Sequence, residues 1–296
     1  MPAHPSFDIV MIGHFAKDKV TYLGETTIYS GGAVYYGSVG LAHLGWRVAI
    51  VTRLHPDDFD RLEEVKQAGV TVFAKAAPAT SGIDNIYTTP DMDRRICKPL
   101  AFAGPFRVED IPDIPAHTWI VGPIIAGEVD MPVLRSLKGR GVLALDIQGF
   151  VRVPVGDDLV FRDWPEKDEG LALVDVLKVD QAEAESLTGL TDVQAAMRRL
   201  SAYGPKEILL TNAAGVNVYA GGQFYHAPFT ARQIKGRTGR GDTCFSSYLA
   251  KRQSADAGEA CRFAAAVTSL KMETPGPFAG TLADVTQRIR EDSAKP

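Results

Sequence analysis

The chain is poor in cysteine, and the few it has share no evident role. Its 296 residues include three cysteines, and no two of them form a Cys-x-x-Cys pair. They are Cys97, Cys244 and Cys261. This odd, scattered set argues against a disulfide framework and against a zinc site. It fits a reducing compartment, so we expect a cytoplasmic protein.

Long apolar runs and an excess of positive charge are also missing. No apolar stretch approaches the roughly 20 residues that cross a bilayer, and Met1 to Phe15 lacks a basic segment followed by a long apolar one. We therefore expect neither a membrane span nor a signal peptide. The formal net charge is −4 and there is no long basic run. That balance argues against nucleic acid as a partner.

What is present is a large apolar fraction arranged in short runs. Hydrophobic residues make up 45% of the chain, enough for a substantial core. Strand-like and helix-like segments alternate, which favours a parallel sheet with right-handed crossovers in one α/β unit over 1–296. The expected strands are 7–13, 47–52, 70–73, 119–122, 142–146, 174–179 and 207–211, with a hairpin over 216–226. The expected helices are 33–44, 57–68, 182–187, 192–203, 245–251 and 259–271.

One region breaks this alternation and reads as a β hairpin. Ile83 to Thr88 alternates polar and apolar residues, and Arg94 to Pro99 follows after a turn-like segment. Val20 to Tyr29 alternates in the same way. We expect about 18–30 and 80–100 to form a small β lid over the carboxyl edge of the sheet, where ligands of open α/β sheets bind. The alternative is an edge hairpin without a function.

The strongest chemical signal lies between Lys235 and Phe245. Two glycines flank Arg240, and Asp242 follows at once, where a helix-like segment begins. Glycines let the backbone turn sharply beside a ligand, and the start of a helix attracts anions such as phosphate. A carboxylate there would repel phosphate, but it could take the proton of a hydroxyl that attacks phosphate. We predict a phosphoryl-transfer site with Asp242 as general base; the alternative is a loop whose aspartate caps the next helix.

Ordered motifs along most of the chain resemble the PfkB/ribokinase family of small-molecule kinases. Thr238–Asp242 matches the second half of the family's Asp-Thr-Thr-Gly-Ala-Gly-Asp signature, and Gly31-Gly32 matches its early glycine pair. Lys178–Glu183 resembles its Asn-x-x-Glu segment. The resemblance implies a three-layer α/β/α sandwich with a mostly parallel sheet and a β lid. It also implies an ATP-dependent kinase for a hydroxyl of a small sugar, a polyol such as inositol, or a nucleoside.

The same resemblance assigns roles to individual residues. Asp242 would be the base, and the backbone amides of Gly239, Arg240 and Gly241 would form an anion hole for the transferred group. Mg²⁺ would bridge the phosphates of ATP and keep several waters. The other implied residues are Asp18, Gly31 and Gly32 for the acceptor, Lys178, Thr211 and Gly215 for the nucleotide, and Asp180 and Glu183 for the metal-bound waters.

Several positions depart from the family pattern. Gly236 stands where the family usually has aspartate, which leaves a monovalent-cation site and potassium dependence open. Arg240 replaces a small residue, and its side chain either contacts phosphate or points to solvent. Tyr36 falls near a position where many sugar kinases have asparagine, so ribose or fructose specificity is not carried over. Arg152 lies in a segment resembling a region beside the family's site, where it would steer phosphate or lie on the surface.

Two other functions compete with the kinase. The departures favour a non-catalytic nucleotide or small-molecule binding protein on a kinase-like fold, whereas the retained Asp242 argues against it. A Rossmann-type oxidoreductase is disfavoured because no Gly-x-Gly-x-x-Gly follows the first strand, which ends at Gly13. The lid could also pair with a second copy in a homodimer through Ile83, Ile86 and Tyr87, or these side chains could cover the chain's own site.

Overall fold

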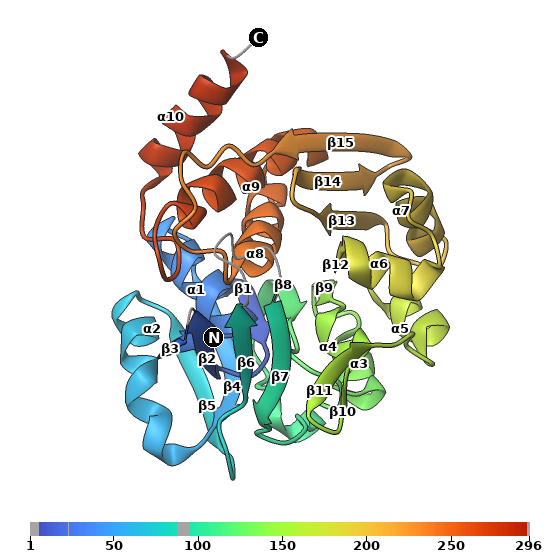
Figure 1. Cartoon of the computed structure of the whole chain (residues 1–296). Helices are drawn as coiled ribbons and strands as arrows, with labels where there is room; N and C mark the ends of the chain where they lie inside the picture. Colours follow the sequence, from blue (N-terminus) through green and yellow to red (C-terminus); the bar gives the residue numbers. More distant parts are fainter. Residues whose placement is uncertain (1–5, 23, 88–94, 295–296) are drawn as a thin grey trace, which may run out of the picture.

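The computed structural model describes residues 6–22, 24–87 and 95–294, and a nine-stranded sheet runs through its centre (Figure 1). The strands are parallel except β14 and β15, which continue the sheet as an antiparallel hairpin beside β13. In sheet order the strands are β15 (Gln223–Pro228), β14 (Gly215–Ala220), β13 (Glu207–Thr211), β12 (Val176–Asp180), β9 (Val142–Asp146), β8 (Ala116–Val121), β1 (Phe7–Ile12), β4 (Val48–Leu54) and β5 (Thr71–Ala76).

Both faces of the sheet are buried, because successive side chains of a strand point to opposite faces. Ile9 and Met11 of β1 belong to one apolar cluster, and Val10 and Ile12 to the other. The first cluster packs against the helices α1 (Ala33–His43), α2 (Glu63–Gln67), α8 (Arg240–Arg252) and α9 (Ala257–Met272). The second packs against α3 (Met131–Leu137), α5 (Lys167–Leu173), α6 (Gln181–Thr188) and α7 (Val193–Ser201).

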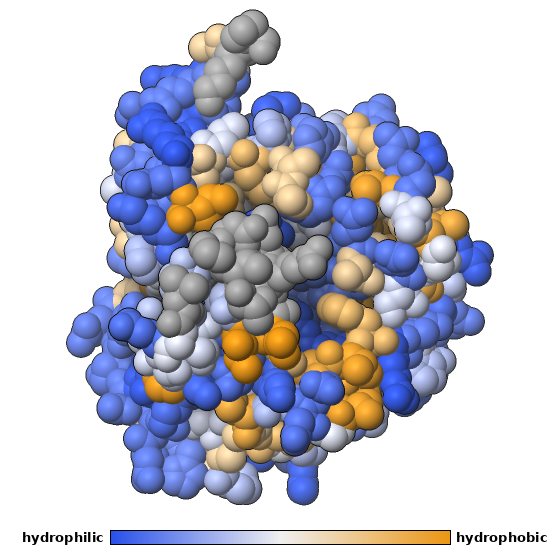
Figure 2. Space-filling model, viewed as in Figure 1, coloured by the Kyte–Doolittle hydropathy of each residue, from blue (hydrophilic) through white to orange (hydrophobic). Residues whose placement is uncertain are grey.

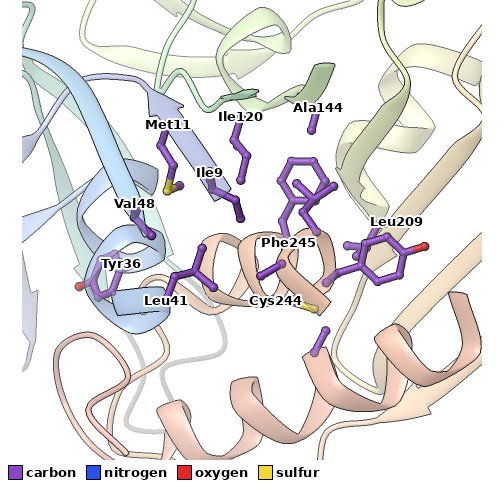
Figure 3. Packing of buried hydrophobic residues seen from close by; sticks show 14 of the residues in the cluster. Ile9, Met11, Tyr36, Leu41, Val48, Ile120, Ala144, Leu209, Cys244 and Phe245 are labelled. Atoms are coloured by element: carbon purple, nitrogen blue, oxygen red, sulfur yellow. The ribbon is translucent and has the colours of Figure 1, made fainter. Parts of the chain in front are cut away.

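Helix α8 lies directly under the centre of the sheet. Figure 3 shows Phe245 of α8 beside Ile120 of β8, and Cys244 of the same helix belongs to the same apolar cluster. Both α8 side chains are almost fully buried, so the helix is held rigidly against the sheet. Its first residue, Arg240, therefore has a fixed place at the carboxyl edge of the strands.

A second, four-stranded sheet forms the lid. Its order is β3 (Glu25–Gly31), β2 (Ala16–Tyr22), β6 (Gly82–Tyr87) and β7 (Arg95–Ala101). Strands β2 and β6 pair in parallel, and each carries an antiparallel neighbour. Figure 2 shows hydrophobic side chains (orange) gathered over β7 and over the small hairpin of β10 (Arg152–Val155) and β11 (Asp158–Phe161).

The predicted α/β/α class with a small β lid is confirmed, with differences in detail. The expected helix 57–68 is a 3₁₀ segment, Pro56–Leu62, followed by the short α2. Helix α8 begins at Arg240 rather than near Phe245, which puts Asp242 in its first turn. The turn expected between β6 and β7 lies outside the described residues.

Some elements were not expected from the sequence. They are the hairpin β10–β11, the short helix α4 (Gln148–Val151), the 3₁₀ turn Val108–Asp110 and the last helix, α10 (Leu282–Ser293). Helix α10 packs on α9 through Val285 and projects from the body of the molecule (Figure 1). Among the described residues, the helices are all too short or too polar to cross a membrane.

Candidate active site

A cavity of about 290 Å³ opens at the carboxyl edge of the main sheet, between the lid and the start of α8. The lid, α1 and the segments that follow β8 and β9 contribute Asp18, Gly32, Ala33, Tyr36, Ile83, Asn85, Tyr87, Ile124 and Gln148. The opposite side is made by the loop before α8, the first turn of α8, β10 and the ends of β12 and β13. These contribute Arg152, Lys178, Asp180, Thr211, Arg237, Thr238, Gly239, Arg240, Gly241 and Asp242. We call these the lid side and the α8 side of the cavity.

Asp242 faces the cavity from the third position of α8, after the cap residue Gly239. Burial, together with the nearby Asp146 carboxylate, raises the pKa of Asp242 from 3.8 to about 6. Three nearby cations oppose that rise: Lys178, Lys271 and Arg152. The group is therefore mostly ionised at neutral pH, yet a much better proton acceptor than an ordinary aspartate.

The loop before Asp242 packs closely against its surroundings at both of its glycines. Gly239 has a φ of +79°, and a Cβ there would lie 2.2 Å from Cγ of Tyr36. A Cβ on Gly241 would lie 3.3 Å from Cε of Lys178. The glycines thus let the backbone approach both an aromatic ring and a buried cation.

The backbone amides of this turn are arranged differently from the expectation. The N–H of Arg240 donates to the carbonyl of Arg237 at 3.2 Å, so in this conformation it is already engaged. As first-turn amides, those of Gly241 and Asp242 have no carbonyl one turn earlier in the helix to bond. The anion hole expected from the amides of Gly239, Arg240 and Gly241 stays a prediction, and a contribution from the Arg240 amide requires its present bond to be exchanged.

Lys178 joins the end of β12 to two acidic groups. Its ammonium lies 3.0 Å from Oδ1 of Asp146 and 3.5 Å from Oε2 of Glu183, and all three side chains are buried. Burial alone would lower the pKa of Lys178, but the surrounding carboxylates raise it above its ordinary value. Lys178 is therefore a permanent cation beside Gly241, suited to an anionic ligand at the start of α8.

Asp180 and Glu183 form a reciprocal cap at the start of α6. The Glu183 N–H donates to Oδ1 of Asp180 at 2.8 Å, and the Asp180 N–H donates to Oε2 of Glu183 at 2.7 Å. Asp180 reaches the cavity, whereas Glu183 is fully buried and is not among its lining residues. Burial raises the pKa of Glu183, an effect that Lys178 opposes.

On the lid side, Asp18 ties two lid strands together. Its Oδ1 accepts the N–H of Ile83 at 2.8 Å, and the side chain lines the cavity. A Cβ on Gly31 would lie 2.3 Å from Oδ2 of Asp18. Gly32 has a φ of +90°, and a Cβ there would lie 2.4 Å from the carbonyl oxygen of His14. Gly31 thus makes room for the Asp18 carboxylate, and Gly32 for the His14 backbone, at the start of α1.

The remaining predicted residues divide between the cavity and its surroundings. Thr211 and Arg152 line the cavity, as does Arg240, whose guanidinium lies 5.6 Å from the ring centroid of Phe229. Gly215 lies at the start of β14, where its carbonyl accepts the N–H of Asn212, and it does not line the cavity. Its predicted role in nucleotide binding stays a prediction.

Sequence reasoning missed Asn85, Arg237 and Lys271. Asn85 and Arg237 line the cavity, and Lys271 lies behind it. Arg237 stands two residues before Gly239, and this position beside the glycine motif could have predicted that it lies at the site. Asn85 belongs to the segment predicted as part of the lid, but it was not singled out there, and no local pattern points to Lys271. Ile83 and Tyr87, considered for a dimer contact, both line the cavity.

Comparison with known proteins identifies the relatives of this chain. Residues 153–282 match the model of the pfkB family carbohydrate kinases. A solved pyrophosphate-dependent kinase in the ribokinase family, complexed with a pyrophosphate analog and myo-inositol, is 36% identical; the match covers 91% of this chain and 97% of that one, with a TM-score of 0.85. A myo-inositol-1 kinase, also pyrophosphate-dependent and converted into a myo-inositol-3 kinase by mutation, is 34% identical over 96% and 99%, with a TM-score of 0.86.

A further relative is named for a nucleoside acceptor. The cytidine kinase of Thermococcus kodakarensis is 27% identical over 257 residues, which is 82% of this chain and 87% of that protein. The matches to the two solved kinases extend over 91% and 96% of this chain, and the match to the cytidine kinase extends over less of it.

Proposed function

The chain belongs to the pfkB (ribokinase) family of carbohydrate kinases, and we propose that it transfers a phosphoryl group from pyrophosphate to a hydroxyl of myo-inositol or a similar cyclic polyol. The observation that carries this proposal is the composition of the two sides of one small cavity. The lid side offers several polar groups for hydroxyls, and the α8 side offers a cluster of cations around Asp242.

Chemically, Asp242 is the general base. Its carboxylate takes the proton of the acceptor hydroxyl while that oxygen forms a bond to phosphorus and the bond from phosphorus to the bridging oxygen of the donor breaks. Inorganic phosphate leaves when the donor is pyrophosphate. Lys178 and the Gly241 amide stabilise the negative charge on the transferred group, which is where phosphoryl-transfer enzymes obtain most of their rate.

The α8 side suits a compact anion better than a nucleotide. Four cationic side chains line it, and guanidinium groups bind phosphate oxygens with two parallel hydrogen bonds. They are Arg152, Lys178, Arg237 and Arg240. Among the described residues, this side of the cavity has no aliphatic or aromatic lining side chain against which a nucleobase could pack. ATP, the donor expected from the sequence, is therefore the second candidate.

The lid side suits an acceptor that carries hydroxyls around a ring. Asp18 can accept hydrogen bonds from two hydroxyls, and the amides of Asn85 and Gln148 can both donate and accept. The phenol rings of Tyr36 and Tyr87 also line this side. This mixture of donors and acceptors suits the hydroxyls of a polyol such as myo-inositol.

The residues at the end of β12 fit a water-held divalent cation in part. Asp180 reaches the cavity, and Oε1 of the buried Glu183 has no hydrogen-bond partner among the described residues. Asp180 would hold waters of a bound Mg²⁺, while Glu183 fixes Asp180 through the reciprocal cap. When bound, Mg²⁺ supplies charge neutralisation at the donor phosphates.

A matrix of donors and acceptors tests this function. Initial rates would be measured for pyrophosphate and for ATP, each with Mg²⁺, against myo-inositol, other inositols, ribose, fructose and cytidine. We expect pyrophosphate with myo-inositol to give the highest kcat/KM. Exclusive use of ATP would overturn the donor, and preference for cytidine would overturn the acceptor. Donor binding without turnover on any acceptor would support the non-catalytic binding protein instead.

A further inference from the structure

Lys271, in the last turn of α9, is a fully buried lysine behind the cavity. Its ammonium donates to the carbonyl oxygen of Gly236 at 2.8 Å and also to that of Thr238. It lies 5.0 Å from the centroid of the Tyr36 ring. A buried charge is costly unless it is fully coordinated, so this position indicates a specific task for the cation.

The segment that supplies these carbonyls is fixed to the end of α9. The N–H groups of Lys235 and Gly236 both donate to the carbonyl of Met272. A Cβ on Gly236 would lie 2.4 Å from the carbonyl oxygen of Thr274. The backbone approaches so closely here that an aspartate at this position would not fit without a shift. The charged group that contacts this segment is the ammonium of Lys271, which donates to its carbonyl oxygens.

We propose that the Lys271 ammonium is a built-in cation that holds the carbonyls of Gly236 and Thr238 and so positions the catalytic turn Gly239–Asp242 without a free monovalent ion. Backbone carbonyls arranged around one cation are the ligands that also bind K⁺. An ammonium group carries the same charge as K⁺ and is close to it in size. Lys271 is thus a positioning residue, and this role rests on the proposed function of Asp242.

Two contacts link Lys271 to the reacting groups. The Tyr36 ring that Lys271 faces is the ring against which Gly239 packs, so the cation and the turn share one support. Lys271 also helps to hold down the pKa of Asp242. In return, Asp242 opposes the fall in the pKa of Lys271, which burial lowers to about 8. Losing the ammonium should therefore disturb both the geometry of the turn and its charge.

The unaltered enzyme gives the first test. Turnover would be measured in KCl, NaCl and choline chloride at equal ionic strength, so that general screening is constant. We expect the three rates to agree within about twofold, because equal ionic strength leaves no screening difference between them. Activation by K⁺ of about tenfold or more, beyond any such screening effect, would overturn the proposal. This test needs no variant.

A variant provides the second test. Lys271→Ala should lose roughly 10²-fold in kcat in choline chloride, as expected for a displaced catalytic group, and recover a large part of it in KCl or NH₄Cl. Arg262→Ala is the matched control, since it removes an exposed cation from the same helix. That control should behave like the unaltered enzyme in all salts.

A readout that does not depend on catalysis separates this proposal from that for Asp242. KCl should raise the melting temperature of Lys271→Ala above its value in choline chloride, and should leave that of the unaltered protein unchanged. If the variant folds poorly, its refolding yield in the two salts reports the same preference. Equal loss of activity in every salt, with no K⁺-specific stabilisation, would reduce Lys271 to a packing role and overturn the proposal.

Discussion

At the scale of single residues, the proposed chemistry depends on where Asp242 stands. The position of Asp242 in the first turn of α8 favours a negative charge, whereas its burial and the nearby Asp146 disfavour one. The outcome is a pKa of about 6. This value lies close to the working pH, where a general base is most effective.

The pH profile should report this group. Below its pKa, Asp242 is protonated and cannot accept the hydroxyl proton, so kcat/KM should fall as the pH decreases through about 6. An ordinary aspartate would place the same decline near pH 4. Measuring kcat/KM between about pH 4.5 and 8, roughly two units around the expected value, in a buffer of constant ionic strength would locate this decline. A rate that stays constant down to about pH 5 would contradict the assignment.

Asp18 has a different task, which concerns binding rather than proton transfer. In Asp18→Asn the amide oxygen can still accept the N–H of Ile83, but the charge is lost. A hydrogen bond to a charged group contributes about 1.5–3 kcal/mol, so KM for the acceptor should rise by about 10- to 100-fold. KM for the donor should stay the same. The exposed Asp60→Asn is the control, and an unchanged acceptor KM would remove Asp18 from the acceptor site.

At the scale of elements, the turn that begins α8 is fixed by the ring beneath it. Gly239→Ala would place a methyl group 2.2 Å from Cγ of Tyr36, in a backbone conformation that already disfavours a side chain. We expect a loss of about 10²-fold in kcat, as for a catalytic group displaced by about 1 Å.

Gly189→Ala separates the clash from the backbone strain. Gly189 has a φ of +71° with no atom within 4 Å of an added Cβ, so its substitution has only the left-handed strain of about 1–2 kcal/mol. Activity should be retained there. Equal effects of both substitutions on turnover would mean that the ring does not position the turn.

The sequence predicted these elements where the signal is local. Short apolar runs located β1, β9 and β13, and the glycines around Arg240 located the turn before α8. Contacts between residues far apart in the chain could not be predicted from the sequence. Lys271 is one lysine at the end of a helix, and only the folded chain brings it to the carbonyls of Gly236 and Thr238. Helix α8 also starts earlier than predicted, since its burial under the sheet outweighs the low helix propensity of Gly241.

At the scale of the whole molecule, the cavity lies where the lid sheet meets the main sheet. This arrangement explains why the acceptor and donor groups come from segments far apart in the chain. Asp18 and Asn85 come from the lid, whereas Lys178 and Asp242 come from the later half. Because the lid contributes side chains to the cavity, substitutions in the lid can change acceptor specificity without changing the turn that begins α8.

A homodimer through the lid stays a prediction. Strand β3 is an edge of the lid sheet, and its Ile28 and Tyr29 are exposed by 45% and 47%. An exposed apolar edge is a surface on which a second chain can pair. Sedimentation equilibrium should give twice the chain mass for the unaltered protein and the monomer mass for Ile28→Lys. A monomer mass for both at high concentration would exclude a stable dimer.

The central claim is that Asp242 enables transfer of a phosphoryl group to a polyol hydroxyl. The most direct test follows ³¹P NMR spectra of myo-inositol and pyrophosphate with Mg²⁺, in the presence of the unaltered enzyme, Asp242→Asn, or the exposed-site control Asp157→Asn. We predict an inositol phosphate ester with the unaltered enzyme and the control, and a rate lower by roughly 10²–10⁴-fold with Asp242→Asn. Equal ester formation by Asp242→Asn, or no ester from pyrophosphate or ATP with the unaltered enzyme, would contradict it.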